Sequence, residues 1–279
     1  MRLVIFLEIK KKHKQSQIRE ILREVNNGSY SIERKEMSLS RIRRYTNLTH
    51  EIVKTGTTNI IELGVCNGIN AELMIRAAQK YNICCEPASI YSKNVIDQPW
   101  DITYYGFDLF EAEIDSIVGE DIPVEGLWAA PLSVSDIRKK LEKTEADIRL
   151  FPGSTFDTLP LFVSHFRNRK FDFIFIDAGH SFEAQRNDWH YVQKLMNNDT
   201  VVLIDDYLEK GHIEGGKEWG VTAAVNEIDR DLYKVEVLEP KDVLPLPEDT
   251  TCTEPYISYD ENDPATNAIV KVTRKGLLI

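Results

Sequence analysis

The sequence feature that most constrains the fold is a regular alternation, from residue 58 onward, of short apolar runs and amphipathic segments. Nearly continuous apolar runs are typical of strands buried on both faces of a sheet, and apolar residues three or four positions apart are typical of helices. The predicted helices include 69–81, 181–196 and 218–230. The predicted strands cover 59–65, 103–110, 146–151, 171–177, 200–206, 232–238 and 268–274.

Strands that alternate with helices form a parallel sheet that carries helices on both faces. No helix separates the last two predicted strands, so we expect these two strands to be antiparallel to each other. The sequence therefore predicts an α/β fold. It is a Rossmann-like, doubly wound sheet of seven mostly parallel strands, with one antiparallel strand.

Residues 1–57 precede this pattern and are predicted to form a helical N-terminal extension, with helices over 14–26 and 39–55. Residues 58–279 then form the main domain. Two stretches of that domain, 82–102 and 111–145, are rich in Pro, Ser and charged residues and break the alternation. We expect them to be loop or helical insertions that shape specificity.

The charge distribution limits the classes of partner. The chain has a net charge of −11, yet residues 1–50 carry 12 Lys and Arg against 5 Asp and Glu, so the rest of the chain is strongly acidic. An acidic body argues against binding along a nucleic-acid backbone. No apolar run is long enough to span a membrane, and the four cysteines lack disulfide or zinc-site spacing. We therefore expect a cytoplasmic protein that does not bind membranes.

Acidic residues follow two of the predicted strands. The stretch 172-DFIFIDAGHSFE-183 turns polar at Asp177, and 201-VVLIDDY-207 ends on Asp205 and Asp206. Asp177 and Asp205 are one strand–helix–strand unit apart, so the three carboxylates are expected at one edge of the sheet. Such residues are also common in turns and helix caps. However, three close carboxylates repel each other, and a magnesium ion would remove that conflict.

Other strand ends carry features of a ligand site. The first strand ends in 62-ELGVCNG-68, where Gly64 and Gly68 flank a turn that lets a ligand approach the backbone. This is not the dinucleotide fingerprint GxGxxG, since Cys66 takes the central position and no third glycine follows. The second strand ends at Asp108, where a carboxylate can accept hydrogen bonds from ribose hydroxyls. The third ends in the turn 152-PGSTFDTLP-160.

These motifs, in this order over residues 58–207, resemble the class I S-adenosylmethionine-dependent methyltransferases. The resemblance is strongest to the metal-dependent O-methyltransferases, which include the catechol and antibiotic-sugar O-methyltransferases. It implies S-adenosylmethionine as cofactor and Mg²⁺ as a second cofactor. The cofactor-binding residues that it implies are Glu62, Gly64, Gly68, Asp108, Ser154, Thr155 and Phe156.

The resemblance also implies metal and catalytic residues. Asp177, Asp205 and Asp206 would ligate the divalent cation, and His180 lies where relatives carry a lysine or histidine suspected as the general base. Two positions depart from the family pattern. Cys66 replaces the middle glycine of the first turn, and Gly179 stands where sugar-modifying relatives often have a second aspartate. His180 is therefore the expected base.

The sequence as a whole predicts an enzyme that methylates a hydroxyl of a small molecule or sugar, with possible assembly into a homo-oligomer. Three alternatives stay open. A metal-independent methyltransferase would use the aspartates as caps or substrate contacts. A nucleotide- or dinucleotide-binding enzyme could have a similar sheet, and a non-catalytic cofactor-binding module could act through the basic N-terminal segment.

Overall fold

The structure is a computed structural model that describes residues 43–85, 102–110, 132–166, 168–209, 212–213, 217–243, 257–258 and 265–276. The predicted helix 14–26 and the first residues of the predicted helix 39–55 lie outside these residues. The rest of that second helix is present as a 3₁₀ turn, η3 (Arg43–Tyr45), followed by α2 (Thr46–Thr55).

The described chain forms one large sheet and one small one. The spatial order of the large sheet is β3 (Asp147–Pro152), β2 (Thr103–Asp108), β1 (Asn59–Leu63), β4 (Phe171–Ile176), β5 (Met196–Glu209), β11 (Thr266–Arg274) and β8 (Tyr233–Val237). The short β9 (Asp242–Val243) also pairs with β11. The small sheet has the order β10 (Ile257–Ser258), β6 (His212–Ile213) and β7 (Lys217–Glu218).

The strand directions confirm the predicted mixed sheet. The pairs from β3 to β5 are all parallel, whereas β11 is antiparallel to both β5 and β8. The last two predicted strands are therefore antiparallel to each other, as expected from the missing helix between them. β5 is longer than the predicted strand 200–206, and it continues past Asp205 and Asp206, where the predicted strand ends.

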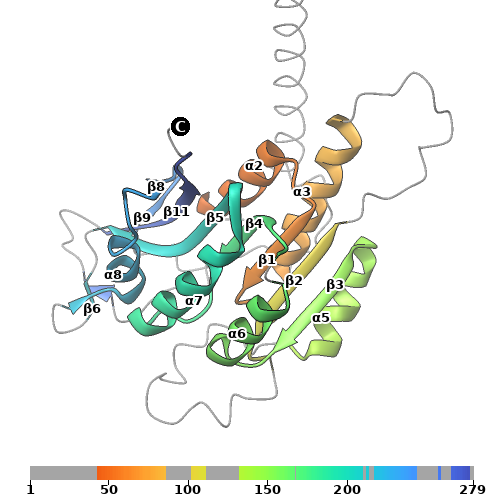
Figure 1. Ribbon diagram of the computed structural model, residues 1–279, viewed down its shortest axis with the longest axis horizontal. Helices are drawn as coiled ribbons and strands as arrows, with labels where there is room; N and C mark the ends of the chain where they lie inside the picture. Colours follow the sequence, from red (N-terminus) through yellow and green to blue (C-terminus); the bar gives the residue numbers. More distant parts are fainter. Residues whose placement is uncertain are drawn as a thin grey trace, which may run out of the picture.

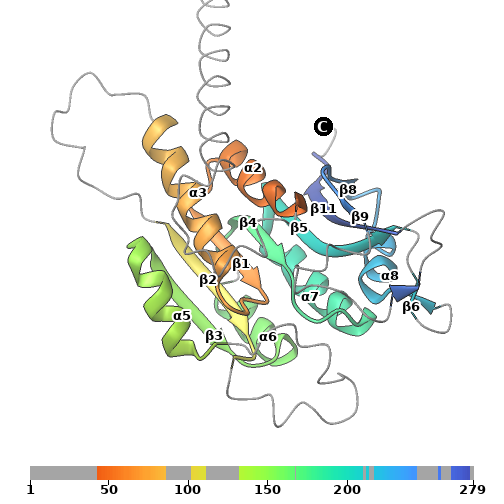
Figure 2. The ribbon, with the colours of Figure 1, turned by 180° about the vertical axis from the view of Figure 1, so that it is seen from behind.

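Helices cover both faces of the large sheet (Figures 1 and 2). One face carries α2, α3 (Ile69–Cys85) and α5 (Val134–Leu141). The other carries α6 (Thr155–His165), α7 (Phe182–Leu195) and α8 (Gly220–Asn226). Neighbouring residues of the central strands point to opposite faces of the sheet. Ile60 packs against the layer of α2, α3 and α5, and Ile61 packs against the layer of α6, α7 and α8. This double burial explains the uninterrupted apolar strands.

The predicted insertion 111–145 contains α5, which packs beside β3. The helix begins where the Ser133 hydroxyl accepts a hydrogen bond from the backbone N–H of Asp136, at 3.1 Å. Ile137 and Leu141, four residues apart, are fully buried against the sheet. The second half of this stretch is therefore part of the fold, because it supplies the helix that connects β2 to β3.

The described part of the N-terminal extension belongs to the same layer. Leu48, Ile52 and Val53 of α2 are fully buried, and the helix ends at Gly56, whose φ of +67° is left-handed. The Glu51 carboxylate lies 2.5 Å from the ammonium group of Lys271 on β11. These contacts fix α2 on the sheet, and so they fix the position of η3, which precedes it. None of the helices within the described residues is long and apolar enough to cross a membrane.

Candidate active site

The site lies at the carboxyl ends of β1, β4 and β5, where the strand order reverses. Open α/β sheets bind ligands at such a switch point. The turn after β1 has three residues with left-handed backbone: Gly64 (φ +91°), Cys66 (φ +48°) and Gly68 (φ +72°). A β-carbon on Gly64 would lie 1.9 Å from the carbonyl oxygen of Asp177. Glycine is required there because the ends of β1 and β4 touch.

Asp108 holds this turn to the end of β2. One of its carboxylate oxygens accepts a hydrogen bond from the backbone N–H of Cys66, at 2.7 Å, and the other from that of Phe110, at 3.0 Å. Each oxygen of a carboxylate has a second lone pair, so the group can accept further hydrogen bonds. Its predicted contact with a ribose stays a prediction, and the structure adds a second role in shaping the turn.

Glu62 is fully buried at the end of β1. The hydroxyl of Tyr104 donates to its Oε2, whereas its Oε1 has no hydrogen-bond partner among the described residues. Burial raises the pKa of Glu62 to about 8. A buried acceptor without a partner is costly, and a ligand N–H can relieve that cost. Glu62 therefore suits the predicted cofactor-binding role.

The turn after β3 places the remaining predicted cofactor residues. Ser154 is the N-cap of α6, and its hydroxyl accepts from the backbone N–H of Phe156 at 3.3 Å. The ring of Phe156 is 51% exposed, which leaves a large apolar surface for contact with a planar ligand. Thr155 hydrogen-bonds the buried carboxylate of Asp188 on α7. The contacts of these three residues with a cofactor stay predictions.

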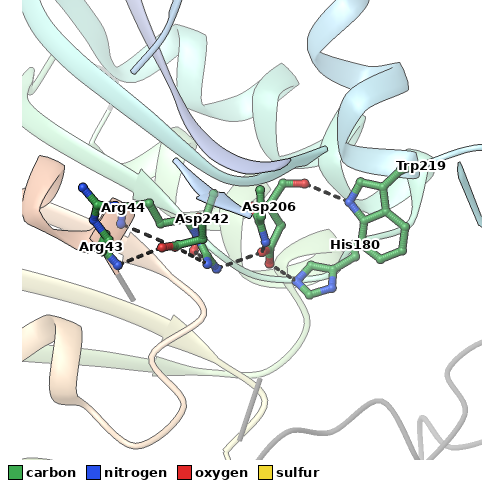
Figure 3. A network of polar contacts seen from close by, with 8 residues as sticks. Arg43, Arg44, His180, Asp206, Trp219 and Asp242 are labelled. Atoms are coloured by element: carbon green, nitrogen blue, oxygen red, sulfur yellow. Dashed lines mark hydrogen bonds and ion pairs between the residues drawn. The ribbon is translucent and has the colours of Figure 1, made fainter. Parts of the chain in front are cut away.

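Asp177, His180 and Asp206 form a group that could hold a metal ion, because one ligand atom from each lies within 4.8 Å of the other two. The His180 Nε2 lies 3.0 Å from the Asp206 Oδ2 (Figure 3). Asp206 has a φ of +56°, a left-handed conformation that aspartate tolerates better than most residues. The expected convergence of the two strand ends is therefore present for Asp177 and Asp206.

Asp205, the third predicted ligand, is bound differently. Both of its carboxylate oxygens accept from the guanidinium of Arg44, at 2.7 Å from Nε and 3.3 Å from Nη2. Arg44 belongs to η3 and is 3% exposed. No local sequence signal marks this arginine, because it is one of many basic residues in a basic segment. The prediction that Asp205 ligates a metal ion stays a prediction.

The start of α8 holds the His180 segment in place. The indole Nε1 of Trp219 donates to the backbone carbonyl of Asp206 at 2.8 Å, and its ring lies 5.5 Å from that of His180. A β-carbon on Gly220 would lie 2.4 Å from the carbonyl oxygen of His180. No local sequence pattern marks Trp219 or Gly220 as functional, because both contacts are long-range.

The electrostatics of the aspartates differ. Burial, and then the charges of Asp205 and Asp206, raise the pKa of Asp177 well above its ordinary value. Burial also raises the pKa of Asp205, against the opposing effect of Arg44. For Asp206, burial acts in the same direction, but His180 and Arg44 outweigh it and hold the pKa below its ordinary value. Asp177 is therefore the carboxylate whose charge is least compensated.

Comparison with known proteins agrees with this fold. A family model described as "Methyltransferase domain" matches residues 61–207, slightly more than half of the chain. The calicheamicin methyltransferase CalS11 is similar in structure, with 17% sequence identity, a TM-score of 0.51, and coverage of 95% of this chain and 92% of that one. The O-methyltransferase from Bacillus cereus in complex with SAH shows 14% identity, a TM-score of 0.49, and coverage of 93% and 91%. No curated protein matches the sequence significantly.

The match to a methyltransferase domain, on a doubly wound sheet with a glycine turn at its switch point, identifies a class I S-adenosylmethionine-dependent methyltransferase. The chain belongs to the methyltransferase-domain family that matches residues 61–207. The family match contains the β1 turn and the three aspartates, whereas Arg44 and Trp219 lie outside it.

Proposed function

We propose that the protein transfers the methyl group of S-adenosylmethionine to a hydroxyl oxygen of a small molecule, with a divalent cation bound beside the cofactor. The observation that carries this proposal is the position of one group of residues. Asp177, His180 and Asp206 offer ligand atoms within 4.8 Å of one another at the switch point that carries the β1 glycine turn. A cofactor, a cation and a base would thus meet at one edge of the sheet.

The chain has suitable groups for each part of the cofactor. The left-handed turn from Gly64 to Gly68 brings bare backbone to the end of β1. Below it, the Glu62 Oε1 is a buried acceptor for the cofactor's amino group, and Asp108 is an acceptor for its ribose hydroxyls. The exposed ring of Phe156 and the cap residues Ser154 and Thr155 would border the adenine.

Asp177 and Asp206 are the residues that we assign to the cation. Magnesium is usually bound by one or two carboxylates and keeps several waters, which suits two carboxylates from neighbouring strand ends. The raised pKa of Asp177 supports this assignment, since a cation would stabilise its charged form. When bound, such an ion lowers the pKa of a substrate hydroxyl and fixes its position.

His180 would then accept the proton of that hydroxyl. Its Nε2 lies 3.0 Å from the Asp206 Oδ2, and the ring lies against Trp219, so the imidazole has a fixed orientation. A base that is held by a carboxylate and a ring needs little reorganisation at the moment of proton transfer. The transferred methyl needs no help from the protein beyond alignment, because the sulfonium of the cofactor makes it electrophilic.

Calorimetry with S-adenosylhomocysteine and the variant Asp108→Ala tests the cofactor site. We expect micromolar binding by the wild type, and a loss of about 1–3 kcal/mol in the variant, because ribose hydroxyls and two turn N–H groups lose their acceptor. Asp172→Ala is the matched control. The Asp172 carboxylate also accepts backbone N–H groups, of Thr58 and Asn59, but at the opposite end of the sheet.

The control should lower stability without changing the affinity for S-adenosylhomocysteine. Equal affinities for the wild type and Asp108→Ala would remove Asp108 from the cofactor site. Repeating the titration with Mg²⁺ tests the cation. Heat from Mg²⁺ that disappears in Asp206→Asn supports the metal-dependent reaction, whereas cofactor binding without any Mg²⁺ heat favours a metal-independent methyltransferase.

A further inference from the structure

A buried network of hydrogen bonds and ion pairs surrounds Arg44 (Figure 3). Its Nε and Nη2 donate to Asp205, at 2.7 and 3.3 Å, and Nη2 also donates to the Asp206 Oδ1 at 3.1 Å. Its Nη1 donates to the Asp242 Oδ2 at 3.0 Å. A guanidinium has five N–H donors in a fixed fork. The four hydrogen bonds that the Arg44 guanidinium donates to Asp205, Asp206 and Asp242 all go to carboxylates. The Arg44 guanidinium therefore uses its donors within the protein and is a poor candidate for binding substrate directly.

Asp206 receives a second donor on the same oxygen. The side-chain amide of Asn267, on β11, donates from Nδ2 to the Asp206 Oδ1 at 2.7 Å. Arg44 and Asn267 together thus occupy Oδ1, and the other oxygen, Oδ2, is the one that lies 3.0 Å from His180 Nε2. The two oxygens of the Asp206 carboxylate therefore have different roles. Oδ1 accepts hydrogen bonds that fix the side chain, and Oδ2 faces the proposed reaction site.

The partners of this network come from fixed positions. Asp242 and Asn267 are directly paired residues of β9 and β11. The Asp242 Oδ1 also accepts from the backbone N–H of Arg43 at 2.9 Å, so β9 holds the main chain of η3 as well as the arginine side chain. A side chain fixed at its backbone and at its head loses little further entropy when it orients a neighbour.

We propose, on the basis of the proposed function, that Arg44 and Asn267 are positioning residues that hold Asp206 with its Oδ2 facing His180 and the cation. In this arrangement Asp205 anchors the side chain of Arg44. Both oxygens of Asp205 accept from the guanidinium, and Asp205 lies outside the group whose ligand atoms are within 4.8 Å of one another, so two carboxylates rather than three would face the cation. Arg44 also supplies the positive charge that lets Asp205, Asp206 and Asp242 be buried together. The two neighbouring carboxylates of β5, Asp205 and Asp206, thus have different roles.

The test uses Arg44→Lys, which keeps the charge and loses the fork. We expect Mn²⁺ affinity, measured by electron paramagnetic resonance, to fall about 10–100-fold, as is typical when a residue that orients a metal ligand is changed. The affinity for S-adenosylhomocysteine should stay within about twofold. Arg149→Lys is the matched control, because Arg149 also forms a two-donor pair with an aspartate, Asp147, on the exposed edge strand β3.

Asp205→Asn and the double variant separate anchoring from ligation. If Asp205 anchors Arg44, the effects of Asp205→Asn and Arg44→Lys on Mn²⁺ affinity overlap, and the double variant is no worse than the more affected single variant. If Asp205 is itself a ligand, the two losses multiply, and the anchoring role is wrong. Asn267→Ala, which removes a neutral donor and leaves the ion pairs intact, should weaken Mn²⁺ binding in the same direction.

A second measurement does not depend on a bound cation. The ¹⁵N resonance of the His180 side chain, assigned by its loss in His180→Gln, reports the hydrogen bond to the Asp206 Oδ2 in the metal-free protein. We expect it to shift in Arg44→Lys and Asn267→Ala but not in Arg149→Lys. If the wild type binds no Mn²⁺, the metal assignment fails while this resonance still tests Arg44. An unmoved resonance with unchanged Mn²⁺ affinity would overturn the proposal.

Discussion

At the scale of single residues, Asp188 shows how the fold supports the turn after β3. Its side chain is fully buried on α7, where it accepts hydrogen bonds from Thr155 and from Asn187, the latter at 3.3 Å. Its Oδ2 has no partner among the described residues, and burial raises its pKa to about 7. The folded protein therefore keeps this carboxyl protonated at pH values where the unfolded chain releases the proton.

This shift predicts a pH dependence of stability. Between about pH 4 and 7 the folded state binds more protons than the unfolded state at this position, so stability falls as pH rises and is level above that window. Asp188→Asn should remove this slope and be more stable than the wild type at pH 8, by about 2–4 kcal/mol. Urea unfolding at several pH values measures the free energy of unfolding of both proteins, with the exposed Asp199→Asn as control. Parallel curves for Asp188→Asn and wild type would contradict the prediction.

The residues of the site divide into those that the sequence could reveal and those that it could not. Asp177 directly follows β4, His180 comes three residues after it, and Asp206 follows the apolar run of β5, so their place at the sheet edge follows from local pattern. Arg44, Asp242 and Asn267 contribute through contacts across more than 60 residues of sequence. No local periodicity marks such contacts, because they depend on how α2, β9 and β11 pack on the sheet.

At the scale of elements, the strands were the most predictable part. Strands buried on both faces must be apolar throughout, so β1, β2 and β4 were visible in sequence. The helix α5 lies in the stretch 111–145, for which the sequence predicted a loop or helical insertion but no helix bounds, because charged residues such as Asp136 and Arg138 interrupt its apolar pattern. Within the predicted helix 39–55, residues Arg43–Tyr45 form the 3₁₀ turn η3, which the sequence pattern does not distinguish from an α-helix because the two have similar periodicity over three residues.

The start of α8 provides a prediction at this scale. A β-carbon at Gly220 would lie 2.4 Å from the His180 carbonyl and 2.5 Å from the Phe182 N. Gly220→Ala should therefore push the His180 segment away by about 1 Å and lower kcat about 100-fold, because the base loses its alignment. The affinity for S-adenosylhomocysteine should not change. The control is Gly276→Ala, where the added carbon meets nothing within 4 Å. Equal kcat values for both variants would show that the segment can adapt.

At the scale of the whole molecule, the acidic site opposes stability. Asp177 is a poorly compensated carboxylate beside two others, and the chain as a whole is acidic, with a net charge of −11. Groups arranged for a ligand often cost stability in its absence, because like charges and desolvation act against folding. A cation that binds the folded state alone should therefore stabilise the entire protein.

This linkage is measurable as a shift of Tm. At a Mg²⁺ concentration about 100 times the dissociation constant, the stabilisation is about 2.7 kcal/mol, which raises the Tm of a chain of this size by roughly 5–10 °C. Asp177→Asn should melt at a higher temperature than the wild type in EDTA and gain little from Mg²⁺. Ca²⁺-free sodium chloride of equal ionic strength is the control. A Tm of the wild type that responds equally to both salts would exclude a specific cation site.

The pairing of β9 with β11 has a consequence for the order in which the site can form during synthesis. Residues 61–207 contain the sheet's central strands and the aspartates proposed to bind the cation, yet Asp206 accepts hydrogen bonds from Arg44 near one end of the described chain and from Asn267 near the other. A growing chain can therefore fold its parallel strands while still attached to the ribosome. The proposed reaction centre would become complete only after β11 has emerged and inserted between β5 and β8.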